Sequence, residues 1–294
     1  MNIDVLCVGH ASYDLVFSVD HHPTADEKIV ADDFLGCGGG PAANAAVTAA
    51  KLGFKSAFAG YLGHDIYGDK HCHELLESGV NTRLIIRGTS PTPLSTIIVK
   101  PNGNRTLINY KGLARALPCQ AIDFSSVTAK VVLFDGHEPQ LSLPLLKQRQ
   151  QQGIPTILDA GSVHEGTLAL MSEVDYLVCS EKFAIQFADD EITALARLAQ
   201  LSKAVVITLG ERGLIWQRGQ DSGNVPAFKV NAIDTTGAGD AFHGAFAAAV
   251  TSNLIWLDLL RYASAAGALC CTKTGARTGI PSKLEHQALL NSKL

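Results

Sequence analysis

The chain has 294 residues, of which 47% are hydrophobic, and its formal net charge is −4 at pH 7. This size suits one large α/β domain. No run of Lys and Arg suggests a nucleic acid or an anionic membrane as partner, and no apolar run approaches the ~20 residues of a membrane helix. The N-terminus lacks the features of a signal peptide. Seven scattered cysteines without CxxC spacing are typical of reduced, mostly buried thiols, so we expect a cytoplasmic protein.

Short β segments separated by polar turns are predicted in the first 110 residues. Asp4–Val8 has the pattern of a buried first strand, and it ends without a GxGxxG motif, which disfavours a dinucleotide-binding dehydrogenase. Tyr13–Val19 and Ile29–Leu35 follow as short strands. Thr96–Lys100 and Arg105–Tyr110 flank the sequence PNGN, which predicts a hairpin.

A glycine-rich loop at residues 38–40 leads into the predicted helix Ala42–Leu52. Its three glycines let the backbone approach a ligand, and Pro41 suits the first turn of a helix. Asn44 would then face the helix start. His71 and His73 lie two residues apart, so they do not share a helical face, and we expect surface residues rather than a metal site.

Strands and helices alternate from residue 130 onward, which predicts a parallel sheet with crossover helices. Asp135 and Asp159 follow two of these strands, at the sheet edge where ligands of open α/β folds gather. The predicted segments are the strands Lys130–Phe134, Pro155–Asp159, Tyr176–Cys179 and Ala204–Leu209, and the helices Pro144–Gln152 and Trp256–Thr272.

The sequence DTTGAGD at residues 234–240 lies between a predicted strand, Val225–Val230, and an alanine-rich helix, Ala241–Val250. Free amides at such a helix start attract an anion. An aspartate here would repel bound phosphate, but Asp240 could act as a base that takes a proton from a hydroxyl while the Gly237–Gly239 amides hold a transferring phosphoryl group. The alternative is a capping turn in which the aspartate favours the helix dipole.

This heptad, together with GGGPAAN at 38–44 and TLGERG at 208–213, resembles the signatures of the ribokinase-like (PfkB) family of carbohydrate kinases. The resemblance implies a single domain with a three-layer αβα sandwich, a central mostly parallel sheet, and a small β lid from residues 12–35 and 92–110. It also implies phosphoryl transfer from ATP with Mg²⁺ to a primary hydroxyl of a small sugar. Lids of two subunits interlock in several members, so we expect a homodimer through the lid.

The same resemblance implies a role for each motif residue. Asp240 would be the base, and the N–H groups of Gly237, Ala238 and Gly239 would form the anion hole. The sugar would be held by Asp14, Asp26, Gly39, Gly40, Asn44, Asn109 and Asp240. The nucleotide would contact Ser180, Thr208, Gly210, Gly213, Gly239 and Ser264. A monovalent cation, expected to be K⁺, would lie beside the anion hole among Asp234, Thr236, Cys270, Lys273, Gly275 and Gly279.

The chain departs from the family pattern after the strand Tyr176–Cys179. Many members carry N-x-x-E there to organise Mg²⁺, whereas Ser180 and Phe183 occupy these two positions here, and Glu181 is out of register. The glycine motif, Asn109 and Ser180 are similar to those of ketohexokinase and sulfofructose kinase members.

The substrate is left open among several classes. A phosphorylated or sulfonated sugar needs cationic groups at its far end, and the sequence alone does not place Arg83, Arg87 or Arg105 there, so a neutral hexose or pentose is predicted. The alternatives are a nucleoside kinase of the same family and a sugar-binding protein that has lost catalysis.

Overall fold

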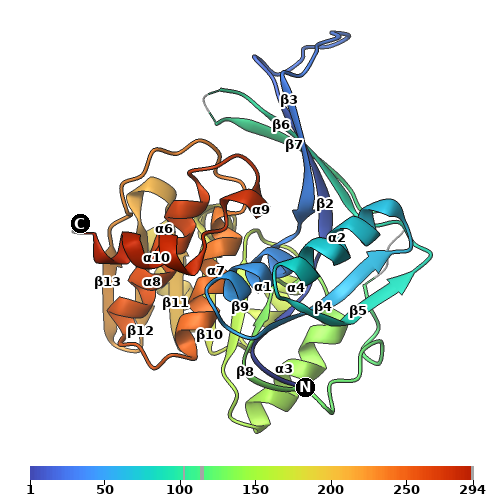
Figure 1. Cartoon of the computed structure of the whole chain (residues 1–294). Helices are drawn as coiled ribbons and strands as arrows, with labels where there is room; N and C mark the ends of the chain where they lie inside the picture. Colours follow the sequence, from blue (N-terminus) through green and yellow to red (C-terminus); the bar gives the residue numbers. More distant parts are fainter. Residues whose placement is uncertain (102, 113–115, 293–294) are drawn as a thin grey trace.

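The computed structural model describes residues 1–101, 103–112 and 116–292. Two sheets organise it (Figure 1): a nine-stranded sheet of order β13-β12-β11-β10-β9-β8-β1-β4-β5, and a four-stranded sheet of order β3-β2-β6-β7 that stands above it. Helices cover both faces of the large sheet, so the predicted αβα sandwich with a small separate sheet is confirmed. None of the helices in the described ranges is both long and apolar enough to cross a bilayer.

The large sheet is mostly parallel, as predicted, because only β12 and β13 run antiparallel to their neighbours. The carboxyl ends of its parallel strands therefore meet at one edge, beneath the small sheet (Figure 1). Its strands are β1 (Asn2–Val8), β4 (Ser56–Gly63), β5 (Asn81–Gly88), β8 (Thr128–Phe134), β9 (Thr156–Ala160), β10 (Tyr176–Ser180), β11 (Ala204–Thr208), β12 (Leu214–Arg218) and β13 (Asp221–Val225).

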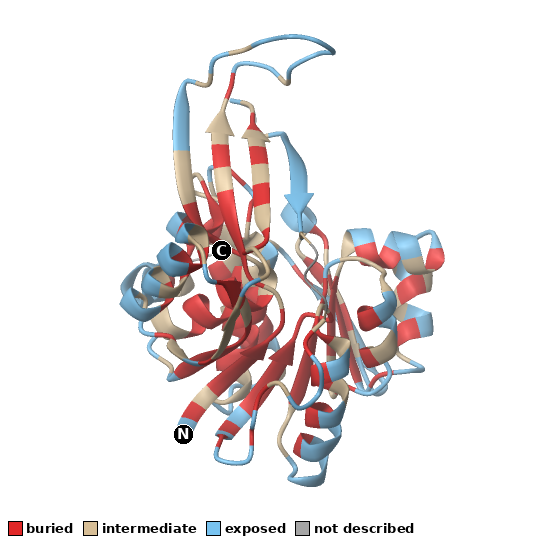
Figure 2. Ribbon diagram, turned by 90° about the vertical axis from the view of Figure 1, so that its right-hand side faces the viewer, coloured by how far each residue is buried: buried red, intermediate tan, exposed pale blue. Residues whose placement is uncertain are grey.

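Alternating side chains divide the core between the two faces of the sheet. In β1, Val5 and Cys7 belong to one buried cluster, and Leu6 and Val8 belong to the other. Figure 2 shows the central strands of the large sheet buried between helices that are exposed on their outer sides. The first cluster is covered by α1 (Pro41–Lys51), α7 (Ala238–Val250) and α8 (Trp256–Cys270), and the second by α3 (Pro139–Gln151), α5 (Glu181–Ala188) and α6 (Glu191–Leu198).

Small side chains let α1 and α7 pack very closely. A Cβ added at Gly244 would lie 2.4 Å from the carbonyl oxygen of Ala45, so only glycine fits at this contact. The close packing brings the first turns of the two helices together. The remaining helices are α2 (Ile66–Glu77), α4 (Glu165–Leu170), the 3₁₀ helix η1 (Gly210–Arg212), α9 (Ala276–Gly279) and α10 (Lys283–Asn291).

The small sheet aligns three polar residues in one row. Asp14 is paired with Ser95, and Ser95 is paired with Asn109, so their side chains share a face. The strands are β2 (Ser12–Ser18), β3 (Asp33–Gly39), β6 (Leu94–Val99) and β7 (Arg105–Tyr110). The last two form the predicted antiparallel pair, although Asn102 in the expected turn lies outside the described residues.

Two predicted strands were wrong in their limits. The strand expected at Val225–Val230 ends at Val225, because Pro226 has no N–H to donate and residues 226–230 form a loop. The strand expected at Ile29–Leu35 is instead Asp33–Gly39, since the glycine motif itself pairs with β2 and an exposed loop precedes it.

His71 is not a surface residue, contrary to the prediction. Its side chain is fully buried beneath the glycine motif, where a Cβ added at Gly38 would lie 2.4 Å from the ring. Its Nε2 accepts a hydrogen bond of 3.0 Å from Nη2 of Arg277, which is also buried. The prediction rested on the spacing of His71 and His73 alone. It could not anticipate Arg277, which lies 206 positions after His71 in the chain.

Candidate active site

The two motifs singled out in the sequence meet at the carboxyl edge of the large sheet. Asn44, in the first turn of α1, donates from Nδ2 to Oδ2 of Asp240 in the first turn of α7 at 2.8 Å. Residues 196 positions apart are joined because Gly244 allows the two helices to touch. The glycine motif and DTTGAGD therefore form one site.

The turn before α7 is held in a fixed conformation from both sides. Gly237 has a φ of 77°, and a Cβ there would lie 2.5 Å from the Cβ of Ala276. Both the backbone conformation and the lack of space therefore require glycine. Asp234 accepts hydrogen bonds from the Thr236 amide (2.8 Å) and hydroxyl (2.6 Å) and from the Gly275 amide (2.7 Å). The Ala238 amide lies 3.3 Å from the Thr235 carbonyl oxygen, a long bond. The start of the 13-residue helix is thus aimed into the site.

The surroundings of Asp240 shift its pKa in opposite directions. Loss of hydration raises the pKa of Asp240, while the hydrogen bond from Asn44 and the nearby His243 lower it. Burial also raises the pKa of Asp14 to about 6, opposed by the hydrogen bond from the Ser12 hydroxyl at 2.9 Å. Several buried carboxylates that lie close together and have raised pKa values are typical of a catalytic site.

The predicted sugar residues fall into two groups. Asp14, Gly39 and Gly40 lie together, since a Cβ at Gly39 would be 2.2 Å from Oδ2 of Asp14, and Gly40 has a φ of 93°. Asn109 shares the row of Asp14 but is exposed. Asp26 is not brought to this group, because it lies in the exposed loop between β2 and β3, at the outer end of the small sheet (Figure 1).

A cavity of about 960 Å³ opens beside the start of α7, a size suited to a small-molecule ligand. Five of the six predicted nucleotide residues line it: Thr208, Gly210, Gly213, Gly239 and Ser264. The loop that replaces the expected strand supplies much of the opposite wall, through Pro226, Ala227, Phe228, Val230 and Ala232. Sequence reasoning missed this wall because it assigned the segment to the sheet.

Ser180 does not line the cavity, and its hydroxyl is engaged elsewhere. It caps α5 by accepting from the Phe183 amide at 3.1 Å, and it donates to the Gly161 carbonyl oxygen at 2.9 Å. Phe183 is fully buried and Glu181 forms an ion pair of 2.7 Å with Arg212. Neither position of the family's N-x-x-E pattern carries a carboxylate, and the described residues hold no group of three His, Cys, Asp or Glu arranged for a metal.

The loops predicted to hold a monovalent cation converge. The Cys270 thiol lies 3.6 Å from the Thr236 carbonyl oxygen and 3.7 Å from that of Ala276. A Cβ at Gly279 would lie 2.2 Å from the carbonyl oxygen of Cys270. The side chain of Lys273 turns outward instead, to Glu285 at 2.9 Å.

Three histidines form a stack that the sequence did not indicate. The rings of His10 and His137 are 5.1 Å apart, and those of His137 and His164 are 4.8 Å apart and nearly parallel. They follow β1, β8 and β9, which are neighbours in the sheet. Asp135 fixes two of them by accepting from the backbone amides of His10 (2.7 Å) and His137 (2.9 Å).

The arginines left open by the sequence go to different places. Arg105 reaches from the small sheet to the turn before α7, where it donates to the Thr235 hydroxyl at 2.7 Å. Arg87 is engaged at the outer edge of the large sheet, with Asp69 at 2.6 Å and the Gly63 carbonyl oxygen. Arg83 is exposed on β5.

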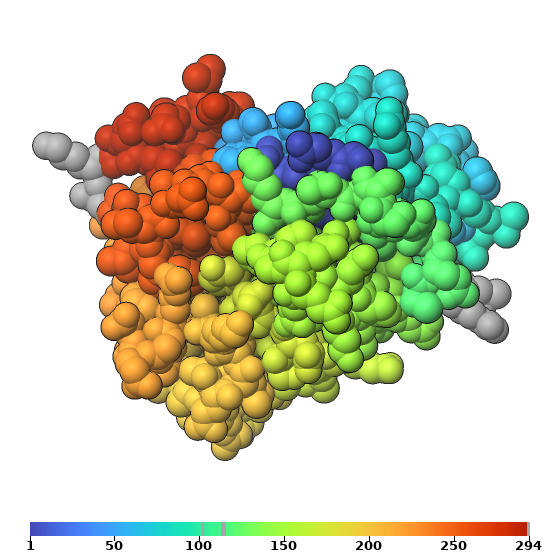
Figure 3. Space-filling view, turned by 90° about the horizontal axis from the view of Figure 1, so that it is seen from below, coloured from blue at the N-terminus to red at the C-terminus, as the bar shows by residue number. Residues whose placement is uncertain are grey.

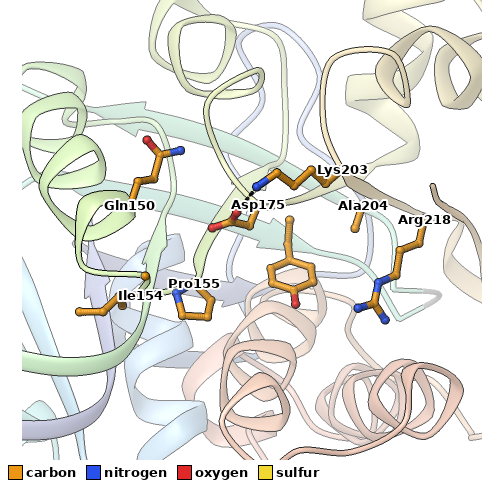
Figure 4. Close-up of a pocket in the computed structure, with 9 residues that line it drawn as sticks. Gln150, Ile154, Pro155, Asp175, Lys203, Ala204 and Arg218 are labelled. Atoms are coloured by element: carbon orange, nitrogen blue, oxygen red, sulfur yellow. Dashed lines mark hydrogen bonds and ion pairs between the residues drawn. The ribbon is translucent and has the colours of Figure 1, made fainter.

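A second hollow, of about 650 Å³, lies at the amino ends of β9, β10 and β11. Figure 3 views this side of the molecule, opposite to the small sheet. Figure 4 shows Lys203 paired with Asp175, at 3.2 Å. Asp175 also accepts from the Thr156 hydroxyl at 2.9 Å, so these charged groups serve the fold. The guanidinium of Arg218 lies over the Trp256 ring.

Comparisons with known proteins agree over nearly the full chain. A family model described as pfkB family carbohydrate kinase matches residues 2–283. A ribokinase of Lactococcus lactis is 30% identical, with 97% of this chain and 96% of that protein covered. The ribokinase structure from Thermotoga maritima has a TM-score of 0.88 at 28% identity, covering 99% of this chain and 100% of that one. An Arabidopsis thaliana ribokinase, solved with ribose and ATP, has a TM-score of 0.82 at 25% identity, covering 100% of both chains.

Proposed function

Because the chain belongs to the pfkB family of carbohydrate kinases, we propose that Asp240 is the base of its reaction and that a small neutral ketose or pentose is its acceptor. The chain is an ATP-dependent sugar kinase. The observation that carries the proposal is the contact between Asn44 and Asp240, which joins the sugar-side motif to the turn beside the nucleotide cavity.

The proposed reaction begins with the acceptor hydroxyl beside Asp240. Asp14, Asn44, Gly39, Gly40 and Asn109 orient the sugar so that its primary hydroxyl faces the carboxylate. Asp240 takes the hydroxyl proton as the oxygen attacks the γ-phosphorus of ATP, and the leaving group is ADP. The amides of Gly237, Ala238 and Gly239 stabilise the charge on the transferring group. The nucleotide is taken as MgATP, although the positions of Ser180 and Phe183 offer Mg²⁺ no carboxylate.

Two further features support this assignment. The small sheet acts as a lid that excludes water, and Arg105 supplies a positive charge at the catalytic turn. A neutral sugar is favoured because Arg87 is paired with Asp69 and comes from β5, the last strand of the large sheet, and Arg83 is exposed on the same strand. The imidazoles of His10, His137 and His164 can donate to and accept from sugar hydroxyls.

The test is ADP release from purified protein with ATP, Mg²⁺ and KCl across ketoses, aldoses, nucleosides and acidic sugars. A signal with one neutral sugar supports the proposal. A signal confined to nucleosides would instead establish the nucleoside kinase alternative. Silence across the panel, with ATP binding shown separately, would favour a sugar-binding protein without catalysis.

We propose a K⁺ site among the carbonyl oxygens of the Asp234–Thr236 turn and the 270–279 loop. A cation there would tighten the anion hole, so kcat is expected to be roughly tenfold higher in KCl than in choline chloride of equal ionic strength. The measurement is the initial rate at saturating sugar and ATP. Equal rates in K⁺, Na⁺ and choline would contradict the site.

We propose that two copies pair through the outer face of the lid. Phe34, Ile108 and Tyr110 share that face and are 55%, 62% and 54% exposed. Pairing would also give Asp26 a role, since its loop could reach the sugar of the neighbouring subunit.

We also propose that the protein is cytoplasmic, in keeping with its seven free thiols.

Ile108→Lys is expected to weaken the dimer at least roughly tenfold, because a charge would be buried at the centre of the contact. Analytical ultracentrifugation of wild type and variant measures this. Ile66→Lys is the matched control, since Ile66 is 63% exposed on α2, outside the lid. A wild-type chain that is monomeric at high concentration would rule out the pairing.

A further inference from the structure

His243 lies one helical turn after Asp240 in α7, with only 3% of its side chain exposed. Both of its ring nitrogens face backbone carbonyl oxygens: Nδ1 is 2.6 Å from Gly239 O, and Nε2 is 3.1 Å from Val178 O. A carbonyl oxygen only accepts hydrogen bonds, whereas a neutral imidazole has a single N–H. The neutral ring would therefore turn a lone pair toward an oxygen at one of these two contacts. A doubly protonated ring would donate at both contacts.

A counter-charge for this buried cation is in place. Oδ2 of Asp159 lies 3.4 Å from Nδ1 of His243. Asp159 is also buried, and within the part of the chain that the structure describes this oxygen has no hydrogen-bond partner. Burial raises the pKa of Asp159 to about 7, and His243 acts in the opposite direction. A buried charge is stable only when paired, and these two groups form such a pair.

We propose that His243 is a positioning residue whose imidazolium, balanced by Asp159, holds the Gly239 carbonyl and keeps Asp240 ionised as the base. The first part stands on the contacts of the ring alone, and the second rests on the proposed role of Asp240. Other elements also act on Asp240. The charged or titratable groups that interact with it, besides His243, are Asp14, Asp135, Asp159, Arg105, Cys270 and Arg277.

The protonation of His243 is measured directly by NMR of protein labelled with ¹⁵N-histidine. Both ring nitrogens of His243 are expected to carry a proton at pH 7.5. Asp159→Asn removes the counter-charge, so His243 is expected to lose one of its two ring protons at the same pH. A wild-type His243 with one bare nitrogen at pH 7.5 would overturn the proposal. This readout does not depend on kinase activity.

The effect on the base is measured from the pH dependence of kcat. His243→Gln keeps an N–H donor for the Gly239 carbonyl but removes the charge. The pKa of Asp240 should then rise, and the acid limb of the profile should move upward by about one to two pH units. Phe246→Leu, also buried in α7, controls for disturbed packing and should leave the limb in place.

The two readouts separate the possible failures. An unchanged acid limb in His243→Gln would overturn the electrostatic role. The same shift in Phe246→Leu would assign it to packing and overturn that role as well. If no sugar is phosphorylated at all, the proposed function fails, and the NMR result still decides whether the buried pair exists.

Discussion

Asp240→Asn is expected to lower kcat by about 10²–10⁴-fold while the sugar still binds. Asparagine has nearly the shape of aspartate and keeps an oxygen that can accept the 2.8 Å hydrogen bond from Asn44. It cannot take a proton from the acceptor hydroxyl. For the same reason wild-type activity should fall as the pH drops through the pKa of Asp240, which burial raises above its ordinary value.

The experiment combines ADP release with calorimetric titration of the sugar. Asp69→Asn is a matched control, because Asp69 pairs with Arg87 at an exposed position and should leave kcat unchanged. Near-normal turnover in Asp240→Asn would remove this residue as the base. Loss of sugar affinity together with kcat would show that the substitution disturbs binding rather than proton transfer.

Gly237→Ala should be the next most damaging substitution, with kcat reduced by roughly 10²–10³-fold. The added Cβ would lie 2.5 Å from the Cβ and 2.9 Å from the Cα of Ala276, at a residue with a φ of 77°. The turn must move, so its amides no longer point at the transferring group. The KM for the sugar should change little, since Asp14 and Asn44 are not displaced.

A comparison with Gly219→Ala isolates the cause. Gly219 also has a positive φ, 60°, but no atom lies within 4 Å of its added Cβ. It joins β12 to β13, away from the site. Both variants should lose some thermal stability, measured as Tm, but only Gly237→Ala should lose turnover. Equal kcat values for the two would contradict a role for the shape of this turn.

Much of the fold could be predicted because the parallel strands are short, continuous apolar runs. The limits of β1, β8, β9, β10 and β11 differ from the predicted ones by at most two residues at either end. The prediction failed at residues 226–230, where an apolar, Pro-led segment resembles a strand but forms a cavity wall. An apolar pattern alone does not distinguish a strand from a segment that lines a cavity, and of residues 226–230 only Phe228 is buried.

Motif residues singled out in the sequence, such as Asn44 and Asp240, are brought into contact by the fold, and their roles stay predictions. The site could not be predicted where proximity depends on sheet order. His10, His137 and His164 stack because β1, β8 and β9 are neighbours in the sheet, and no local signal specifies that order. The pairing of His71 with Arg277 was missed for the same reason.

The junction of α1 and α7 has a consequence for folding. The proposed sugar residues Asp14 and Asn44 come from the first part of the chain, and the proposed nucleotide cavity is lined by residues between 208 and 271. Neither half holds a complete site, and the two are joined where Gly244 meets Ala45. A ligand that bridges them binds the native state alone, and at a hundred times its Kd it would add about 2.7 kcal/mol to the free energy of unfolding. With the proposed sites, bound substrates would hold the two parts of the chain together, and we expect the protein to resist unfolding most when both are bound.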